Sequence, residues 1–178
     1  MKAWRGNWDW RKIRNDLAAT SFGCQHFAVD PSGRAGLLAL LRQAAASVWV
    51  PEPVAREIRA YGTDDPTATA LASHAWLEVK PVDAITGELL AWNLGAGETS
   101  VIALAQSSPG SMAVIDDLAG RRCAEAMGLP LRGTVGLVLA AKKAKLIVAA
   151  RPLLEQLRNK GMYLSDAVLN RALHRVGE

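Results

Sequence analysis

Hydrophobic positions along the chain follow two periods, one typical of helices and one typical of strands. The leucines of residues 35–46 fall on one helical face, whereas residues 76–80 alternate apolar with polar, as a half-buried strand does. We expect strands over residues 47–50, 76–80 and 112–115, and helices over 35–46, 52–61, 67–75, 98–107, 118–127, 134–145, 151–159 and 165–176. Short strands that alternate with helices predict an α/β domain around a small parallel sheet.

Composition limits the class of protein. Half of the 178 residues are hydrophobic and 21% are charged, which suits one globular domain with a real core and excludes global disorder. No apolar run approaches the roughly 18–20 residues that cross a bilayer, and no apolar segment follows the basic N-terminus as in a secretory signal. Cys24 and Cys123 are isolated, which indicates reduced thiols. We therefore expect a cytoplasmic protein without a membrane association.

Charge changes sign along the chain. Residues 50–117 hold ten acidic and three basic residues, whereas residues 118–178 hold eleven basic and four acidic ones. An acidic middle followed by a basic end suits a cation site beside a surface that attracts phosphate. Solvated helix faces explain the same charges, so both interpretations stay open.

The first 23 residues differ from the rest. Trp4, Trp8 and Trp10 stand among Arg and Lys, and no helix or strand period is sustained there. Aromatic and basic residues in alternation can stack on single-stranded nucleic acid, but a loosely packed extension explains them as well. We expect an atypical N-terminal extension over residues 1–23 and one α/β domain over residues 24–178.

Acidic residues stand at positions that a parallel sheet would bring together. Asp116 and Asp117 directly follow the strand predicted over 112–115, Glu98 lies in the first turn of a helix, and Glu57 lies on the helix after the strand 47–50. Reactive groups gather beyond the carboxyl ends of parallel strands, and clustered carboxylates suit Mg²⁺ or Mn²⁺. Each residue also has a plainer explanation, since Glu98 favours the helix dipole and either aspartate can cap a helix.

Taken in order, several segments resemble the PIN-domain family, in particular a compact prokaryotic branch related to VapC-type toxin ribonucleases. The resemblance covers about residues 33–177. The segments that carry it are Val50–Ile58, Leu94–Ala105, Val114–Ala124, Leu129–Leu139, Arg151–Leu154 and Leu164–Asp166.

The resemblance implies a three-layer α/β/α fold and an acidic site that binds Mg²⁺ or Mn²⁺ and cleaves single-stranded RNA. By position, Glu57, Glu98 and Asp117 match catalytic acids of the family, with Asp116 beside Asp117 as a further metal ligand. Thr134 matches a position at which a hydroxyl group can assist the metal shell. An antitoxin partner and a homodimer are implied as well.

One family feature is not matched. The family begins with a strand that ends in its first acid, but residues 20–27 read Thr-Ser-Phe-Gly-Cys-Gln-His-Phe, with no carboxylate and no apolar strand pattern. Asp16 and Asp30 are the nearest acids. Either the chain has lost the first strand and acid, or its start differs from that of its relatives. A catalytically degenerate module that binds RNA or an antitoxin without cleavage is therefore the alternative function.

Basic residues after the aspartate pair are candidates for RNA contact. Arg121 and Arg122 lie one helical turn beyond Asp117, and Lys142 lies on a later helix. Exposed helix faces explain the same residues.

The scattered histidines have no ligand spacing, and we expect them to be surface or packing residues: His26, His74 and His174.

Overall fold

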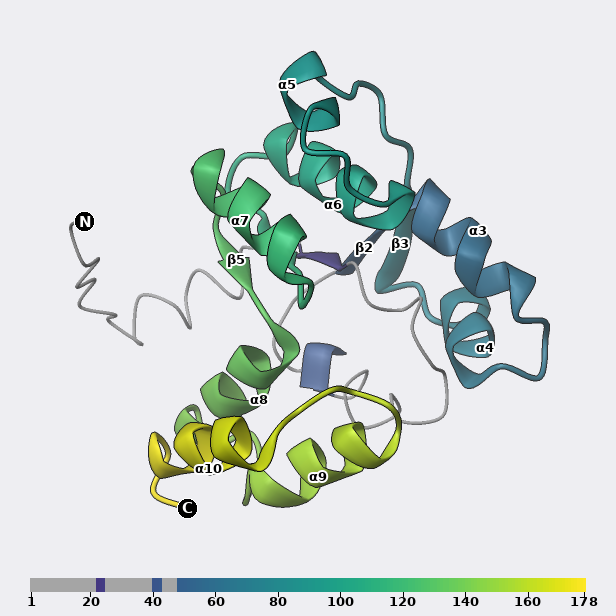
Figure 1. The fold of residues 1–178 in the computed structure, drawn as a ribbon. Helices are drawn as coiled ribbons and strands as arrows, with labels where there is room; N and C mark the ends of the chain where they lie inside the picture. The colour runs from purple at the N-terminus through teal and green to yellow at the C-terminus, as the bar shows by residue number, and fades with distance from the viewer. Residues whose placement is uncertain (1–21, 25–39, 43–47) are drawn as a thin grey trace.

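The computed structural model describes residues 22–24, 40–42 and 48–178 (Figure 1). The strands are β1 (Phe22–Cys24), β2 (Val48–Pro51), β3 (Leu77–Lys80), β4 (Met112–Val114) and β5 (Leu131–Arg132). The helices are α3 (Glu52–Ala60), α4 (Pro66–Ser73), α5 (Gly87–Leu90), α6 (Ala96–Gln106), α7 (Leu118–Ala126), α8 (Thr134–Lys143), α9 (Arg151–Asn159) and α10 (Asp166–His174).

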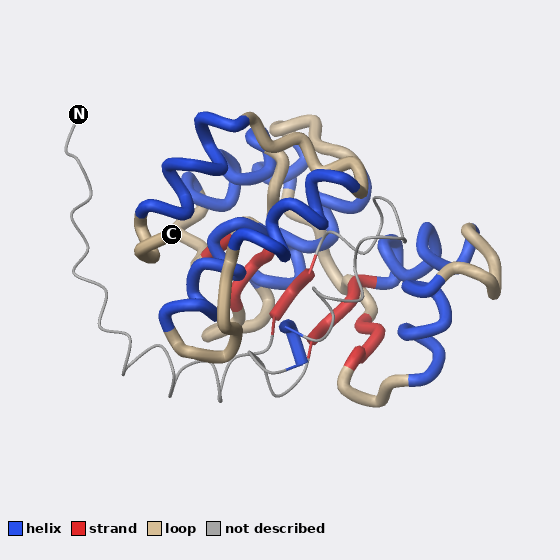
Figure 2. Tube along the Cα trace, turned by 90° about the horizontal axis from the view of Figure 1, so that it is seen from below, coloured by secondary structure: helices blue, strands red, loops and turns tan. Residues whose placement is uncertain are grey.

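The five described strands form one parallel sheet in the order β3-β2-β1-β4-β5. Helices α5, α6 and α7 gather on one side of it, and α8, α9 and α10 lie on the other (Figure 1). Figure 2 shows the strands lying between helices. Helices α3 and α4 contact β3, at one edge of the sheet. The predicted α/β fold with a small parallel sheet is confirmed.

The sequence periods account for the strands and helices around the sheet. In β2, Val48 and Val50 are fully buried while Trp49 between them is half-buried, as a period of two requires. Pro51 ends the strand, and α3 begins at Glu52 with a proline in its first turn, where a missing N–H costs nothing. The predicted strands at 47–50, 76–80 and 112–115 and all the predicted helices from residue 52 onward are confirmed to within two residues or so at each end.

Strand β1 corrects one expectation. Phe22–Cys24 lies in the middle of the sheet, where it pairs in parallel with β2 and with β4. The interpretation that the chain has lost the first strand is therefore wrong. A run of only three residues has no detectable period, and its pairing partners lie far away in sequence. Phe22 and Gly23 of the predicted extension belong to this strand. The rest of the extension lies outside the described residues and stays a prediction.

Two short elements were not predicted. Helix α5 is one turn, whose N-cap Thr86 accepts a hydrogen bond from the Leu89 backbone N–H at 3.2 Å. Strand β5 is two residues long, between Pro130 and Gly133. Of the helix predicted over residues 35–46, the structure describes 40–42, which are helical.

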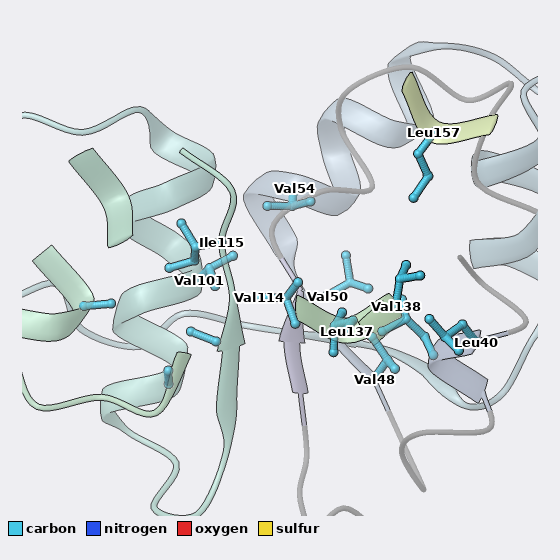
Figure 3. Close-up of a cluster of buried hydrophobic side chains, with 14 of the residues drawn as sticks. Leu40, Val48, Val50, Val54, Val101, Val114, Ile115, Leu137, Val138 and Leu157 are labelled. Atoms are coloured by element: carbon cyan, nitrogen blue, oxygen red, sulfur yellow. The ribbon is translucent and has the colours of Figure 1, made fainter. Parts of the chain in front are cut away.

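One cluster of buried apolar side chains joins the sheet to both helix layers (Figure 3). Val48 and Val50 of β2 belong to it, as do Val101 of α6, Val138 of α8 and Leu157 of α9. Burial of such side chains is the main favourable term for folding. It fixes α6 and α8, on opposite sides, relative to the strand ends that carry the acidic residues. None of the described helices is long and apolar enough to cross a membrane.

Candidate active site

The order of the strands marks one edge of the sheet as the place for a site. From β1 the chain proceeds outward through β2 to β3, then returns to place β4 on the other side of β1. In open parallel sheets, ligands bind beyond the carboxyl ends of the strands at such a reversal. Asp116 and Asp117 lie there, directly after β4 and Ile115.

Asp117 is the N-cap of α7. Its Oδ2 accepts a hydrogen bond from the Gly120 backbone N–H at 2.8 Å, which satisfies one of the free amide groups of the first turn. The side chain is exposed, and none of the described residues donates to its Oδ1. Asp117 is thus both a helix cap and a carboxylate with one oxygen left for a ligand.

Glu98 lies across from Asp117, in the first turn of α6. Its half-buried side chain packs against Gly120, where a β-carbon would stand 3.3 Å from Glu98 Cγ and 3.0 Å from Ile115 Cγ2. Glycine at 120 therefore lets α6 and α7 approach each other closely. Gly120 also donates to Asp117, so both residues contact this glycine, while the Glu98 carboxylate lies against Gly95, where a β-carbon would stand 2.3 Å from Glu98 Oε2.

Glu57 comes to the same region from α3. The residue is exposed, and helix α3 packs against α6. A β-carbon at Gly97 would lie 4.0 Å from Glu57 Oε2 and 3.8 Å from Val54 Cγ2. Glu57 thus faces the residue that precedes Glu98, and the three predicted catalytic acids come to one end of α6.

Asp116 points elsewhere. Its Oδ1 accepts a hydrogen bond from the Thr134 backbone N–H at 2.7 Å, and its Oδ2 accepts one from Thr134 Oγ1 at 2.5 Å. Thr134 is 3% exposed and is the first residue of α8. Asp116 and Thr134, the two residues that we expected at the metal, are therefore hydrogen-bonded to each other.

The basic residues differ in their surroundings. Arg121 is half-buried and its Nη1 donates to the Ile115 carbonyl at 3.3 Å, whereas Arg122 is exposed. Lys142 contacts none of the predicted catalytic acids. Its ammonium donates to the Val148 carbonyl and lies 3.3 Å from Glu178 Oε1. Among the three candidates for RNA contact, Arg122 has the most accessible side chain.

Two glycines shape the packing around the candidate site, and sequence reasoning missed them. Gly120 interrupts the predicted helix 118–127, and such a glycine usually has a packing reason, so the signal was present. Gly133 precedes α8, and a β-carbon there would stand 2.6 Å from Arg121 Nη1 and 2.9 Å from Asp116 Oδ1. That crowding arises between distant segments, and local sequence carries no sign of it.

The chemistry of Glu98 and Asp117 fits a hard divalent cation. Mg²⁺ keeps several waters and is commonly held by one or two carboxylates together with substrate phosphates. Within residues 22–24, 40–42 and 48–178, no group of three His, Cys, Asp or Glu side chains is placed to hold a metal ion. A cation here would therefore be held by few protein ligands and would rely on water and phosphate for the others.

Comparison with known families gives one match. A family model described as a PIN domain matches residues 33–178, which include Glu57, Glu98, Asp116 and Asp117. No curated protein and no solved structure matched the chain.

Proposed function

The chain belongs to the PIN-domain family, whose members are generally nucleases, and from this premise we propose that it is a metal-dependent endoribonuclease of the toxin–antitoxin type that cleaves single-stranded RNA. Glu57, Glu98 and Asp117 are its catalytic acids. The metal is Mg²⁺ or Mn²⁺, because both prefer carboxylate oxygens.

The observation that carries the proposal is the convergence of Glu98 and Asp117 on Gly120. Glu98 contacts Gly120 through its Cβ and Cγ, and Asp117 accepts a hydrogen bond from the N–H of the same glycine, beyond the carboxyl end of β4. A cation bound between the two carboxylates would neutralise their like charges. A divalent metal at such a site orients a water for attack on a phosphodiester and neutralises the charge that develops.

Each residue of the proposed site has its own role. Asp117 and Glu98 supply the oxygens that hold the cation, and the hydrogen bond from Gly120 keeps the Asp117 carboxylate turned toward α7. Glu57, whose side chain is exposed, is the proposed acceptor of a proton from an attacking water. Arg122 on the outer face of α7 is the proposed contact for RNA phosphate.

The proposal also covers partners and location. We propose a protein antitoxin that inhibits the enzyme, a homodimer as its assembly, and the cytoplasm as its compartment, which suits two cysteines without close-spaced partners.

The test is cleavage of a mixed single-stranded RNA pool by the purified full-length chain in Mn²⁺ or Mg²⁺. Asp117→Asn keeps a good N-cap but loses the charge, so we expect a folded variant with activity reduced at least about a hundredfold. Asp65→Asn is the matched control, because Asp65 caps α4 in the same way away from the site. Cleavage that survives EDTA or Asp117→Asn would contradict the proposal.

A second candidate function is a PIN domain that binds RNA or an antitoxin without cutting. Residues 20–27 contain no carboxylate, and the described acids do not form a three-ligand group, which favours this alternative. A folded protein that binds RNA but never cuts in either metal would establish it.

A further inference from the structure

Asp116 differs from Asp117 in what its carboxylate does. Both oxygens of Asp116 accept short hydrogen bonds from one residue, Thr134, which lies 18 positions further along the chain. Each of these hydrogen bonds occupies one of the roughly two lone-pair sites of its oxygen, so the Asp116 carboxylate has fewer sites left for another ligand than that of Asp117. The adjacent aspartates thus face different partners, Asp117 toward α7 and Asp116 toward α8.

Asp116 supplies a hydrogen-bond acceptor for the N-terminus of α8. Its N-cap is Gly133, which has no side chain to satisfy the free amide groups of the first turn. The Asp116 carboxylate accepts from the first of those amides and from the hydroxyl of the same residue, so it serves as the cap from a distant segment. Because Thr134 is buried, loss of this acceptor would leave a buried N–H and O–H without a partner.

Ile115 and Asp116 connect the end of β4 to β5, α7 and α8. Ile115 N donates to the Arg132 carbonyl of β5 at 2.9 Å, and the Ile115 carbonyl accepts from Arg121 of α7. Arg121 and Asp116 both crowd over Gly133, where even a β-carbon would collide with them. The peptide that leads into Asp117 is therefore held from β5, α7 and α8 at once.

We propose that Asp116 is a positioning residue, which ties the N-terminus of α8 to the end of β4 and thereby fixes the direction of the Asp117 carboxylate, without contacting metal or RNA itself. This rests on the proposed function, since it names the residue that orients a proposed metal ligand. It assigns Asp116 and Thr134 to a tether in place of the metal shell that we expected from the sequence.

The test compares conservative and disruptive variants of both residues, with Mn²⁺ binding measured by calorimetry without RNA, beside RNA cleavage and thermal unfolding. Asp116→Asn and Thr134→Ser keep hydrogen-bonding groups, so we expect Mn²⁺ affinity within roughly threefold of the parent chain. Asp116→Ala and Thr134→Val break the tether, and each should weaken Mn²⁺ binding about tenfold, with no further loss in the double variant. Asp65→Ala, which removes a distant cap, should lower Tm and leave Mn²⁺ binding unchanged.

Two results would overturn the proposal. If Asp116→Asn weakens Mn²⁺ binding as strongly as Asp117→Asn while Thr134→Val does not, Asp116 is a metal ligand. If the losses from Asp116→Ala and Thr134→Val add, the two residues do not act as one unit. Should the parent chain neither bind Mn²⁺ nor cut RNA, the proposed function fails by itself. The tether is then decided by unfolding alone: Tm losses that do not add support it, and losses that add contradict it.

Discussion

Glu98 and Gly120 are in contact across the interface of α6 and α7, at a spacing that leaves little room for a side chain at 120. A β-carbon at Gly120 would stand 3.3 Å from Glu98 Cγ and 3.0 Å from Ile115 Cγ2. In an ordinary helix interior, Gly→Ala stabilises by about 1 kcal/mol. Here the added methyl must push against two half-buried or buried neighbours, and overpacking of this kind costs about 1–3 kcal/mol.

We therefore expect Gly120→Ala to lower the free energy of unfolding slightly and to reduce RNA cleavage roughly ten- to a hundredfold, because it moves Glu98 away from Asp117. Denaturant unfolding and cleavage kinetics measure the two effects. Gly87→Ala is the control, since a β-carbon at Gly87 meets nothing within 4 Å. Equal activity of the two variants would show that the close contact of α6 with α7 is irrelevant to the reaction.

Much of this fold could be predicted because its signals are local. Alternation in residues 76–80 and the aspartates after Ile115 placed β3 and the end of β4 without any knowledge of neighbours. Strand β1 could not be predicted in this way, since three residues show no period and the strand exists through its pairing with β2 and β4. Some strands of the sheet are thus marked by local sequence patterns, whereas β1 depends on pairing with strands that are distant in sequence.

The site shows the same division. The sequence was sufficient to select the pair Asp116 and Asp117, because both follow a predicted strand directly. What separates them is Thr134, which engages both oxygens of Asp116 and leaves Asp117 free to cap α7. The difference between the two aspartates depends on the position of the first residue of α8, which follows β5. Strand β5 is only two residues long, which is too short to predict from sequence.

RNA binding should depend on Arg122 through charge alone. The residue is exposed on α7, and no carboxylate in the described part of the chain pairs with it. If it contacts one phosphate of a single strand, Arg122→Ala lowers the slope of log affinity against log salt by about 0.7. Binding of a labelled, non-cleavable RNA at several salt concentrations measures this. Arg171→Ala on α10 is the control, as an exposed arginine on the other side of the sheet (Figure 1), and equal slopes for both variants would exclude Arg122 from the contact.

The last prediction concerns stability and pH, through Glu178. Its Oε1 accepts from the Ala150 N–H at 2.8 Å and its Oε2 from the Arg151 N–H at 3.0 Å, where α9 begins without a side-chain cap of its own. These two hydrogen bonds, with the nearby Lys142 ammonium, hold the pKa of Glu178 below its usual range. The carboxylate therefore joins α8, α9 and the end of the chain as long as it is ionised.

A pKa that is lower in the folded than in the unfolded chain stabilises the fold above the unfolded value, about 4.3 for glutamate, and this contribution is lost as the pH falls through the folded value. Glu178→Gln should accordingly lower the free energy of unfolding by about 1 kcal/mol at pH 7, the size of a helix cap. The difference from the parent chain should shrink toward zero near pH 3. Urea unfolding at both pH values measures it, with Glu125→Gln, an exposed residue of α7, as the control. A deficit that is as large at pH 3 as at pH 7 would mean that the charge of Glu178 is not what joins α8, α9 and the end of the chain.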